Sequence, residues 1–448
     1  MVSVKIVEVC RVTPQRAPSI SAAPENQHLP LTFFDLLWLR FIPVERLYFY
    51  KTSFTDSVLP KLKTSLSLTL QHFTPLAGNL TWPKESIKPV LSYVQGDAVS
   101  LTVAESDADF DHLSTSDFLA SQDLSPLVPQ LNVSHDQAAA MALQITVFPK
   151  RGFSIGTVMH HSVLDGKTST SFVKAWALIC KHEEAQVLPS SLTPFYDRRV
   201  VKDPAGLGEL YSLQQQHKDG RTDDRSLSNG SIGKAPKAPE DLVRGSFEFT
   251  SAFIQRLRAH VTKTAFDSSL HLSTFSLVCA YTWVCMVKAE EIKGEKTVLI
   301  FGVDSRSRLD PPIPATYFGN CVVGRVTVAE TKGLLGRDGF VVAVRAIAEA
   351  VRSLEKGVLN GAENWVSKFL DFSVYDRIYS IAGSHRFEIY DTDFGWGKPK
   401  RYEVIFIDKT RAISLSDCKN GCGGVEVGLV LKKECMKAFD SLFASVVH

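Results

Sequence analysis

The chain has 448 residues, of which 44% are hydrophobic and 22% are charged, as in ordinary globular proteins with room for two or three domains. Its 50 basic and 48 acidic residues give a formal net charge of +2, with no excess of positive charge for phosphates. This balance argues against a nucleic-acid partner and makes small molecules the expected ligands.

Apolar and polar residues alternate from residue 2 to residue 6, which predicts a strand. A secretory signal peptide has an unbroken apolar stretch instead, so we expect a cytosolic protein. The longest apolar run, residues 272–287, is too short and too rich in hydroxyl groups to cross a bilayer and predicts a buried helix. The eight cysteines are scattered, and no second pair accompanies Cys418 and Cys422. We therefore expect reduced thiols and no metal site.

The first half of the chain mixes expected helices and strands. Residues 57–73 carry leucines at every fourth position in their middle, which predicts a helix with one buried face. Residues 142–148 and 153–160 are two alternating runs joined by a short polar stretch that contains proline and glycine. They predict a β-hairpin.

Residues 214–241 are rich in charge, Ser, Gly and Pro, which predicts a solvated linker near the middle of the chain. The elements expected after it are a strand at 246–249, a helix over 253–261, strands at 297–304, 402–408, 412–416 and 423–431, and a helix over 433–443. Two mixed α/β domains of similar size follow from this order.

Two overlapping patterns compete for a catalytic role near the hairpin. Residues 152–156 fit G-x-S-x-G, the turn that presents a serine nucleophile. That turn requires a strand that ends at the serine and a helix directly after it. Ser154 instead lies inside the second strand of the hairpin, so we reject the serine-hydrolase interpretation. Gly156 then marks a bulge or a close backbone approach.

The second pattern, H-H-S-V-L-D-G at residues 160–166, lies where the strand ends and a helix begins. His161 therefore falls in a loop between two rigid elements, a common place for catalytic groups. We expect His160 to be a packed residue rather than a second base. The helix is expected to start with Thr168 or Ser169 as its cap. Its apolar face is expected to consist of Phe172, Val173, Trp176, Ala177 and Cys180.

Residues 393–399 have the sequence D-F-G-W-G-K-P, in which two glycines around Trp396 and a following proline predict a tight turn. The D-F-G triplet also occurs in protein kinases. However, the sequence has no glycine-rich phosphate loop, V-A-I-K lysine or H-R-D loop at a suitable distance upstream. We therefore reject a kinase.

Together, HHSVLDG and DFGWGKP resemble the paired motifs of the plant BAHD acyltransferases, which use acyl-coenzyme A donors. The resemblance covers essentially the whole chain. Further segments that resemble the family lie at 29–39, 62–80, 272–283, 303–309 and 317–321. The last of these, Y-F-G-N-C, is similar to the clade that acylates flavonoid, anthocyanin and other phenolic glycosides, often with malonyl-coenzyme A.

The resemblance implies an α/β, two-domain, chloramphenicol-acetyltransferase-like fold with mixed β-sheets and a channel between the domains. The N-terminal domain would span 1–190 and carry HHSVLDG, and the C-terminal domain would span 242–448 and carry DFGWG. Residues 191–241 would form a crossover linker. The partners would be acyl-coenzyme A as co-substrate and a phenolic glycoside as acceptor, with no permanently bound cofactor, metal, nucleic acid or membrane. We expect a monomer.

The resemblance also implies roles for single residues. His161 would be the general base for a sugar hydroxyl, because imidazole titrates near ~6.5 and can accept a proton at neutral pH. Asp165 would orient the catalytic loop by pairing with an arginine of the D-x-R-x-R segment, and we favour Arg306 over Arg308. A structural role near the coenzyme A channel is implied for Asp393, Gly395, Trp396 and Gly397.

A malonyl donor carries a free carboxylate, which calls for a cation near the acyl group. Lys167 is the candidate by position, and a solvated lysine at a helix start is the alternative. The main rival function is transfer of a hydroxycinnamoyl group to an anthocyanin or another phenolic acceptor. A peptide-synthetase condensation domain also has H-H-x-x-x-D-G, but the DFGWG loop and the lack of a carrier domain argue against it. A non-catalytic protein on the same fold would be expected to lose His161.

Overall fold

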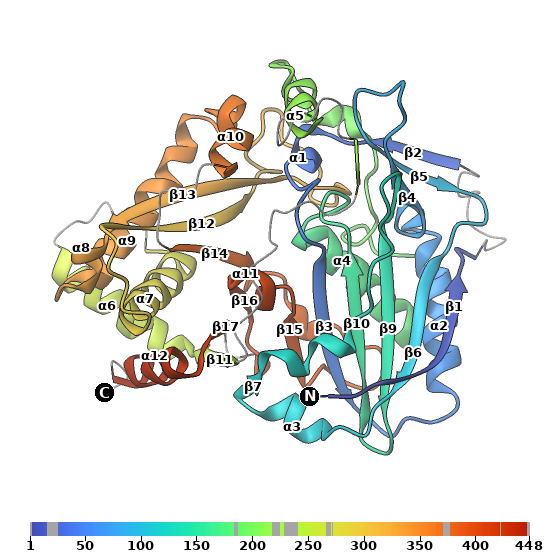
Figure 1. Ribbon diagram of the computed structural model, residues 1–448, viewed down its shortest axis with the longest axis horizontal. Helices are drawn as coiled ribbons and strands as arrows, with labels where there is room; N and C mark the ends of the chain where they lie inside the picture. The colour runs from blue at the N-terminus through green and yellow to red at the C-terminus, as the bar shows by residue number, and fades with distance from the viewer. Residues whose placement is uncertain are drawn as a thin grey trace.

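The computed structural model describes residues 2–15, 26–182, 187–216, 225–227, 241–265, 270, 272–370, 377–421 and 423–445. Two lobes lie side by side in it (Figure 1), the first half of the chain mainly in one and the second half mainly in the other. Most of the predicted linker at 214–241 falls outside the described residues. The chain just before it is helical, in α5 (Leu207–Gln216), which packs into the core of the N-terminal lobe.

A six-stranded sheet forms the centre of the N-terminal lobe, in the order β1-β6-β9-β10-β3-β15. Its strands are β1 (Lys5–Val12), β3 (Val44–Lys51), β6 (Val99–Glu105), β9 (Met141–Phe148), β10 (Gly152–Met159) and β15 (Arg401–Val404). β9 and β10 pair antiparallel and form the predicted hairpin. β10 lies inside the sheet, and all its residues are buried.

Helices cover both faces of this sheet. α2 (Val58–Leu70) and α4 (Gly166–Lys181) pack against each other and share a core with Phe153 and Ile155 of β10. The leucines of α2 at positions 62, 66 and 70 are fully buried, as the spacing predicted. α3 (Phe110–Thr115) packs on the opposite face against Leu47 and Phe49, because side chains of a strand alternate between its two faces.

The C-terminal lobe contains a seven-stranded mixed sheet in the order β13-β12-β14-β16-β17-β11-β7. Its strands are β7 (Phe118–Ala120), β11 (Leu242–Phe249), β12 (Lys296–Asp304), β13 (Val322–Glu330), β14 (Ile378–Gly383), β16 (Ile413–Asp417) and β17 (Val425–Lys432). Its core contains residues of α6 (Ser251–Ala265), α7 (Thr274–Ala289), α9 (Gly339–Arg352) and α12 (Lys433–Ser445). α7 is buried on nearly every side, which confirms the buried helix predicted there.

The remaining elements are short. A four-stranded sheet at the edge of the N-terminal lobe contains β2 (Asn26–Pro30), β4 (Asn79–Thr81), β5 (Val90–Val94) and β8 (Gln137–Ala139). Short α-helices are α1 (Phe33–Leu36), α8 (Thr331–Leu335), α10 (Trp365–Leu370) and α11 (Ile407–Thr410). Single 3₁₀ turns are η1 (Thr74–Ala77), η2 (Ser121–Asp123), η3 (Ser125–Leu127), η4 (Arg198–Val200), η6 (Ser353–Lys356), η7 (Ala362–Asn364) and η9 (Ile389–Asp391).

Two strands cross from one lobe to the other. β7 comes from the first half of the chain but pairs with β11 in the C-terminal sheet, and β15 comes from the second half but pairs with β3 in the N-terminal sheet. The strand predicted at 402–408 was too long. β15 ends at Val404, and the chain then turns into α11. The chain therefore links the two sheets at β7 and β15 as well as at the central crossover.

Candidate active site

The loop between β10 and α4 exposes one side chain. His161 is partly exposed, whereas the other five residues of the loop, at 160 and 162–165, are buried. Burial anchors the loop at every position except His161, and the loop follows a strand inside the sheet. His161 is therefore held in a fixed place while its side chain stays within reach of a ligand.

His160 is a packed residue, as expected. Its exposed fraction is 1%, and its Nδ1 accepts hydrogen bonds from the Oγ–H of Ser162 at 2.9 Å and from the Ser162 N–H at 3.3 Å. Burial lowers the pKa of His160 to about 3, so its imidazole is neutral at physiological pH.

Two aromatic side chains enclose the His161 imidazole. Trp38 stacks on it with ring centroids 4.0 Å apart and planes 5° apart, and Phe41 meets it edge-on at 5.4 Å. These rings limit the rotation of the imidazole and shield part of it from water. Burial lowers the pKa of His161 to about 4, so the ring is neutral and can accept a proton at physiological pH. No motif singled out Trp38 and Phe41, although both lie in or beside the family-like segment at 29–39.

Asp165 caps α4 and joins it to the C-terminal lobe. Its Oδ1 accepts the Thr168 N–H at 2.9 Å, which makes Asp165 itself the N-cap. The expected cap at Thr168 or Ser169 was therefore wrong, because the helix begins at Gly166. The Oδ2 of Asp165 forms an ion pair with Arg306 at 2.8 Å and accepts the Cys321 N–H at 3.1 Å. A buried carboxylate needs such partners.

The pairing of Asp165 with Arg306 is the one that the resemblance implied, and Arg308 is exposed. Arg306 lies just after β12 and is 2% exposed. Its Nη2 donates to the carbonyl oxygens of Tyr317 and Gly319, each at 3.1 Å, and its Nη1 contacts Asp304 at 3.0 Å. Arg306 thus holds the start of α4 against the segment 317–321 of the C-terminal lobe.

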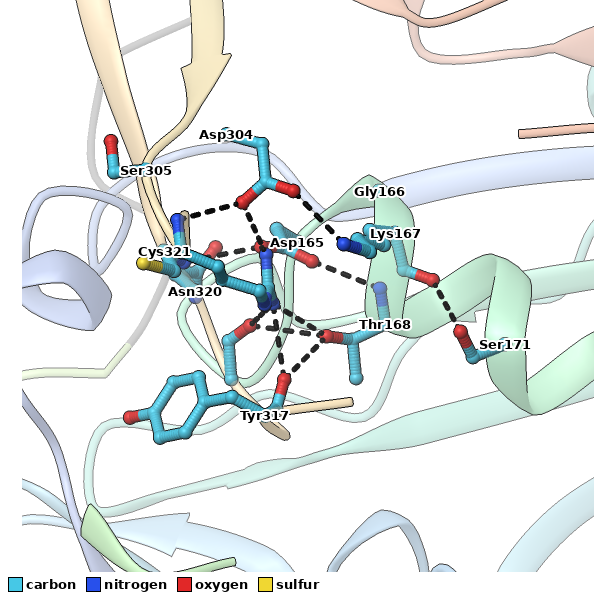
Figure 2. A network of polar contacts seen from close by, with 12 residues as sticks. Asp165, Gly166, Lys167, Thr168, Ser171, Asp304, Ser305, Tyr317, Asn320 and Cys321 are labelled. Carbon is cyan, nitrogen blue, oxygen red and sulfur yellow. Dashed lines mark hydrogen bonds and ion pairs between the residues drawn. The ribbon is translucent and has the colours of Figure 1, made fainter. Parts of the chain in front are cut away.

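Lys167 has a carboxylate partner within this network. Its Nζ lies 3.0 Å from the Oδ2 of Asp304, and Figure 2 shows the two side chains pointing toward one another. Lys167 also lines a small pocket together with Thr168, Ser171 and Tyr317. A malonyl carboxylate at Lys167 would have to compete with Asp304 or share the ammonium group with it. The assignment of Lys167 to the acyl group stays a prediction.

A second buried network, centred on Asp35, reaches the loop that carries His161 from another side. Asp35 lies in α1 and is fully buried. Its Oδ2 accepts from Arg198 at 3.1 Å, and its Oδ1 accepts the backbone N–H of Asn320 at 2.9 Å and the Nδ2–H at 3.0 Å. The Nδ2 of Asn320 also donates to the carbonyl oxygen of His161 at 2.9 Å. The sequence contained only two signs of this network: a carboxylate, Asp35, inside an apolar run, and the asparagine of Y-F-G-N-C, Asn320.

The DFGWG turn lies at the other end of the N-terminal lobe from His161. Asp393 accepts the N–H groups of Gly395 and Gly397, both at 2.8 Å, and pairs with Lys181 at 2.7 Å. Both glycines have positive φ angles, 105° and 92°, which other residues rarely adopt. Trp396 packs edge-on against Phe153 at 5.6 Å.

Lys181 is the last residue of α4 and Phe153 lies near the start of β10, whereas His161 follows the end of β10 and precedes the start of α4. A helix of 16 residues, such as α4, is about 24 Å long. The turn therefore supports the scaffold without reaching the imidazole. Its place beside coenzyme A stays a prediction.

The rejected serine pattern is part of the sheet. Ser154 is fully buried in β10 and pairs there with Phe49 and Thr146. A Cβ at Gly156 would lie 2.4 Å from the carbonyl oxygen of Leu127, so this glycine allows the close backbone approach that we expected.

Three further observations concern metals, thiols and membranes. In the described part of the chain, no group of three or more His, Cys, Asp and Glu side chains could hold a metal ion. The cysteines described there all have free thiols, and Cys422 lies outside the described residues. No helix among the described residues has the length and apolar character needed to span a membrane.

Comparison with known proteins places this site in a family. A model of the Transferase family matches residues 4–445. Phenolic glucoside malonyltransferase 2 of Arabidopsis thaliana is 42% identical, covering 99% of each chain, and agmatine coumaroyltransferase of the same plant is 38% identical, covering 98% of each. The crystal structure of vinorine synthase matches with a TM-score of 0.68 and 21% identity, covering 97% of this chain and 96% of that one, which shows a common fold. The chain belongs to the BAHD family of acyl-coenzyme A-dependent acyltransferases.

Proposed function

We propose that this protein transfers a malonyl group from malonyl-coenzyme A to a sugar hydroxyl of a flavonoid, anthocyanin or other phenolic glucoside, with His161 as the general base. The observation that carries the proposal is the exposure of His161 in a loop whose other residues are buried. The similarity to a phenolic glucoside malonyltransferase over almost the full length supports the donor and the acceptor class.

The reaction needs a base because a sugar hydroxyl is a weak nucleophile at neutral pH. The neutral imidazole of His161 accepts the hydroxyl proton while the oxygen attacks the thioester carbonyl carbon. The tetrahedral intermediate then collapses, the C–S bond breaks, and the imidazolium returns the proton to the coenzyme A thiolate. The products are the malonyl ester and free coenzyme A, and no covalent enzyme intermediate is required.

Asp165 acts on this reaction through the loop. Both of its oxygens have partners, in the Thr168 N–H, the Cys321 N–H and Arg306. These partners hold the start of α4 and the loop before it in one position. The Asp165 carboxylate is therefore a positioning group and not the third member of a proton relay.

The test is acyl transfer from malonyl-coenzyme A to a panel of phenolic glucosides, with product mass as the readout. The wild type should add one malonyl group. His161→Ala should lower the rate by about 10²- to 10⁴-fold, the usual contribution of a general base. His182→Ala removes an exposed histidine at the far end of α4 and should leave the rate unchanged. Full activity of His161→Ala would contradict the proposal.

A second donor is favoured by one observation. Agmatine coumaroyltransferase is almost as similar to the chain as the malonyltransferase is, at 38% against 42% identity. The alternative function is therefore transfer of a hydroxycinnamoyl group, such as coumaroyl, to an anthocyanin or another phenolic acceptor. Equimolar malonyl- and coumaroyl-coenzyme A in one reaction separate the two donors, because the product masses differ. Exclusive coumaroyl transfer would remove the malonyl assignment and keep the role of His161.

The protein works as a cytosolic monomer in this proposal. This expectation rests on the resemblance to the family alone. Sedimentation at micromolar concentration tests it, and a particle of twice the chain's mass would contradict it.

A further inference from the structure

In the proposed reaction, His161 carries a positive charge for part of the cycle. When its imidazole takes the hydroxyl proton, it becomes an imidazolium until the proton passes to the coenzyme A thiolate. Burial lowers the pKa of His161 to about 4, so the surroundings of the ring oppose this charged form. A group that stabilises the imidazolium therefore lowers the barrier to proton transfer.

The carboxylate of Asp165 is already committed to other partners. Its two oxygens are shared by Arg306 and two backbone N–H groups. Asp165 still acts to raise the pKa of His161, but Arg46 on β3 acts in the opposite direction. His160, the preceding residue, is neutral because its pKa is about 3. Among the described residues, no carboxylate is therefore paired with this ring alone.

The indole of Trp38 covers one face of the same ring. The two ring centroids lie 4.0 Å apart, and the two planes differ by only 5°. The face of an indole is rich in electrons, and among aromatic side chains it attracts a cation within about 6 Å of its centroid most strongly. The stack therefore places the negative face of Trp38 against the atoms that share the charge of the imidazolium.

Trp38 is held in this position by the segment on which it lies. Its backbone N–H donates to the carbonyl oxygen of Asp35 at 3.1 Å, and its own carbonyl oxygen accepts the Phe41 N–H at 3.1 Å. The Phe41 ring is nearly perpendicular to both members of the stack, 5.2 Å from Trp38 and 5.4 Å from His161. Asp35 in turn binds Asn320, whose Nδ2 donates to the His161 carbonyl oxygen. One network thus fixes both rings.

We propose that Trp38 is a positioning residue that acts through His161: the face of its indole holds the imidazole in one plane and stabilises the imidazolium that forms when the base takes the hydroxyl proton. This role rests on the proposed function, because it assumes that His161 is the base. The indole thereby does for this histidine what the carboxylate does in a Ser-His-Asp triad. Its contribution belongs to kcat, because the charge exists only once proton transfer has begun.

The test varies the electron density of the indole with little change in its shape. Tryptophan analogues with an increasing number of ring fluorine atoms are placed at position 38 of the full-length enzyme, because fluorine withdraws electron density from the ring face. The kcat for malonyl transfer to a phenolic glucoside should fall with each added fluorine, and the KM for malonyl-coenzyme A should change less than kcat. An unchanged kcat across the series would overturn the proposal.

Trp365 is the matched control, because a cation also lies over its ring. The guanidinium carbon of Arg325 is 5.9 Å from the Trp365 ring centroid. Trp365 lies in α10, whereas the rings described against His161 are those of Trp38 and Phe41. The same analogues at position 365 should leave kcat at the wild-type value. An equal fall of kcat at both positions would mean that fluorine acts on the fold in general, and it would overturn the role of Trp38.

Two substitutions at position 38 provide a second test. Trp38→Phe keeps a smaller aromatic face, whereas Trp38→Leu keeps an apolar side chain without one. Loss of the face should lower kcat by about 2- to 30-fold, as expected for a cation–π contact, and Trp38→Phe should recover part of that loss. Equal kcat in the two variants would contradict the role of the aromatic face.

The pH profile separates this role from simple shielding of the ring. If the indole stabilises the imidazolium, the most fluorinated analogue should lower the pKa of His161 and move the rise of kcat/KM to a lower pH than in the wild type. A rise at the wild-type pH would mean that the indole acts only by packing, which would overturn the electrostatic role. Full activity of His161→Ala would instead contradict the proposed function, whatever the analogues show.

Discussion

Replacing Arg306 with methionine should loosen the junction between the lobes and the loop that carries His161. The substitution removes the 2.8 Å ion pair with Asp165 and the hydrogen bonds to the Tyr317 and Gly319 carbonyl oxygens. Asp165 is 1% exposed and would keep a buried charge without its cation. Removing one partner of a buried pair costs about 3–5 kcal/mol.

The expected change in melting temperature follows from the length of the chain. At about 2.1 cal/mol/K per residue, 448 residues give an unfolding entropy of about 0.9 kcal/mol/K if the lobes unfold together. A loss of about 3–5 kcal/mol then lowers the midpoint by about 3–5 °C. Thermal unfolding by circular dichroism and a parallel measurement of kcat test this, and kcat should fall because the loop is no longer held.

Two variants sharpen the experiment. Arg308→Met alters an exposed arginine whose side chain makes a 3.5 Å contact to the Asp304 carbonyl oxygen, and it should change the midpoint by less than about 1 °C. Asp165→Asn combined with Arg306→Met removes the uncompensated charge and should recover part of the lost stability. A midpoint and kcat equal to the wild type in Arg306→Met would refute the reasoning.

Three further outcomes are expected. Burial lowers the pKa of His161 to about 4, and a general base works when it is neutral. The value of kcat/KM should therefore rise with pH through about 4 and stay level to pH 7. A rise near ~6.5 instead would mean that the imidazole is solvated. Asp393→Ala removes an ion pair and two hydrogen bonds to backbone N–H groups from the DFGWG turn, so the midpoint of thermal unfolding should fall by about 1–3 °C. In steady-state assays, the KM for acyl-coenzyme A should rise more than kcat falls. A fall in kcat alone would place this turn nearer to the reacting groups. Gly156→Ala places a methyl group 2.4 Å from the Leu127 carbonyl oxygen and should lower the free energy of unfolding by about 1–3 kcal/mol, as measured with denaturant. Gly333→Ala is the control, because its methyl group meets only an ordinary 3.6 Å contact. Equal stability of both variants would count against the close approach.

The sequence by itself determined most of the secondary structure and the position of His161, the proposed base. Hydrophobic periodicity is a local property, so the leucines of α2 and the all-round apolar character of α7 predicted buried helices that the structure confirms. The break between β10 and α4 likewise placed His161 in a loop. Local sequence also decided against Ser154, because β-forming residues continue on both sides of it.

Tertiary structure alone decided what surrounds His161. Asp35 and Asn320 are 285 residues apart, and their hydrogen bonds form only because the lobes meet beside the loop. The crossing of β7 and β15 could not be predicted, since alternation shows that a strand is half-buried but not which sheet it joins. The capping of α4 by Asp165 was missed for a related reason. Its carboxylate can cap the helix that follows it or pair with Arg306, which lies 141 positions away, and only the fold shows that it does both.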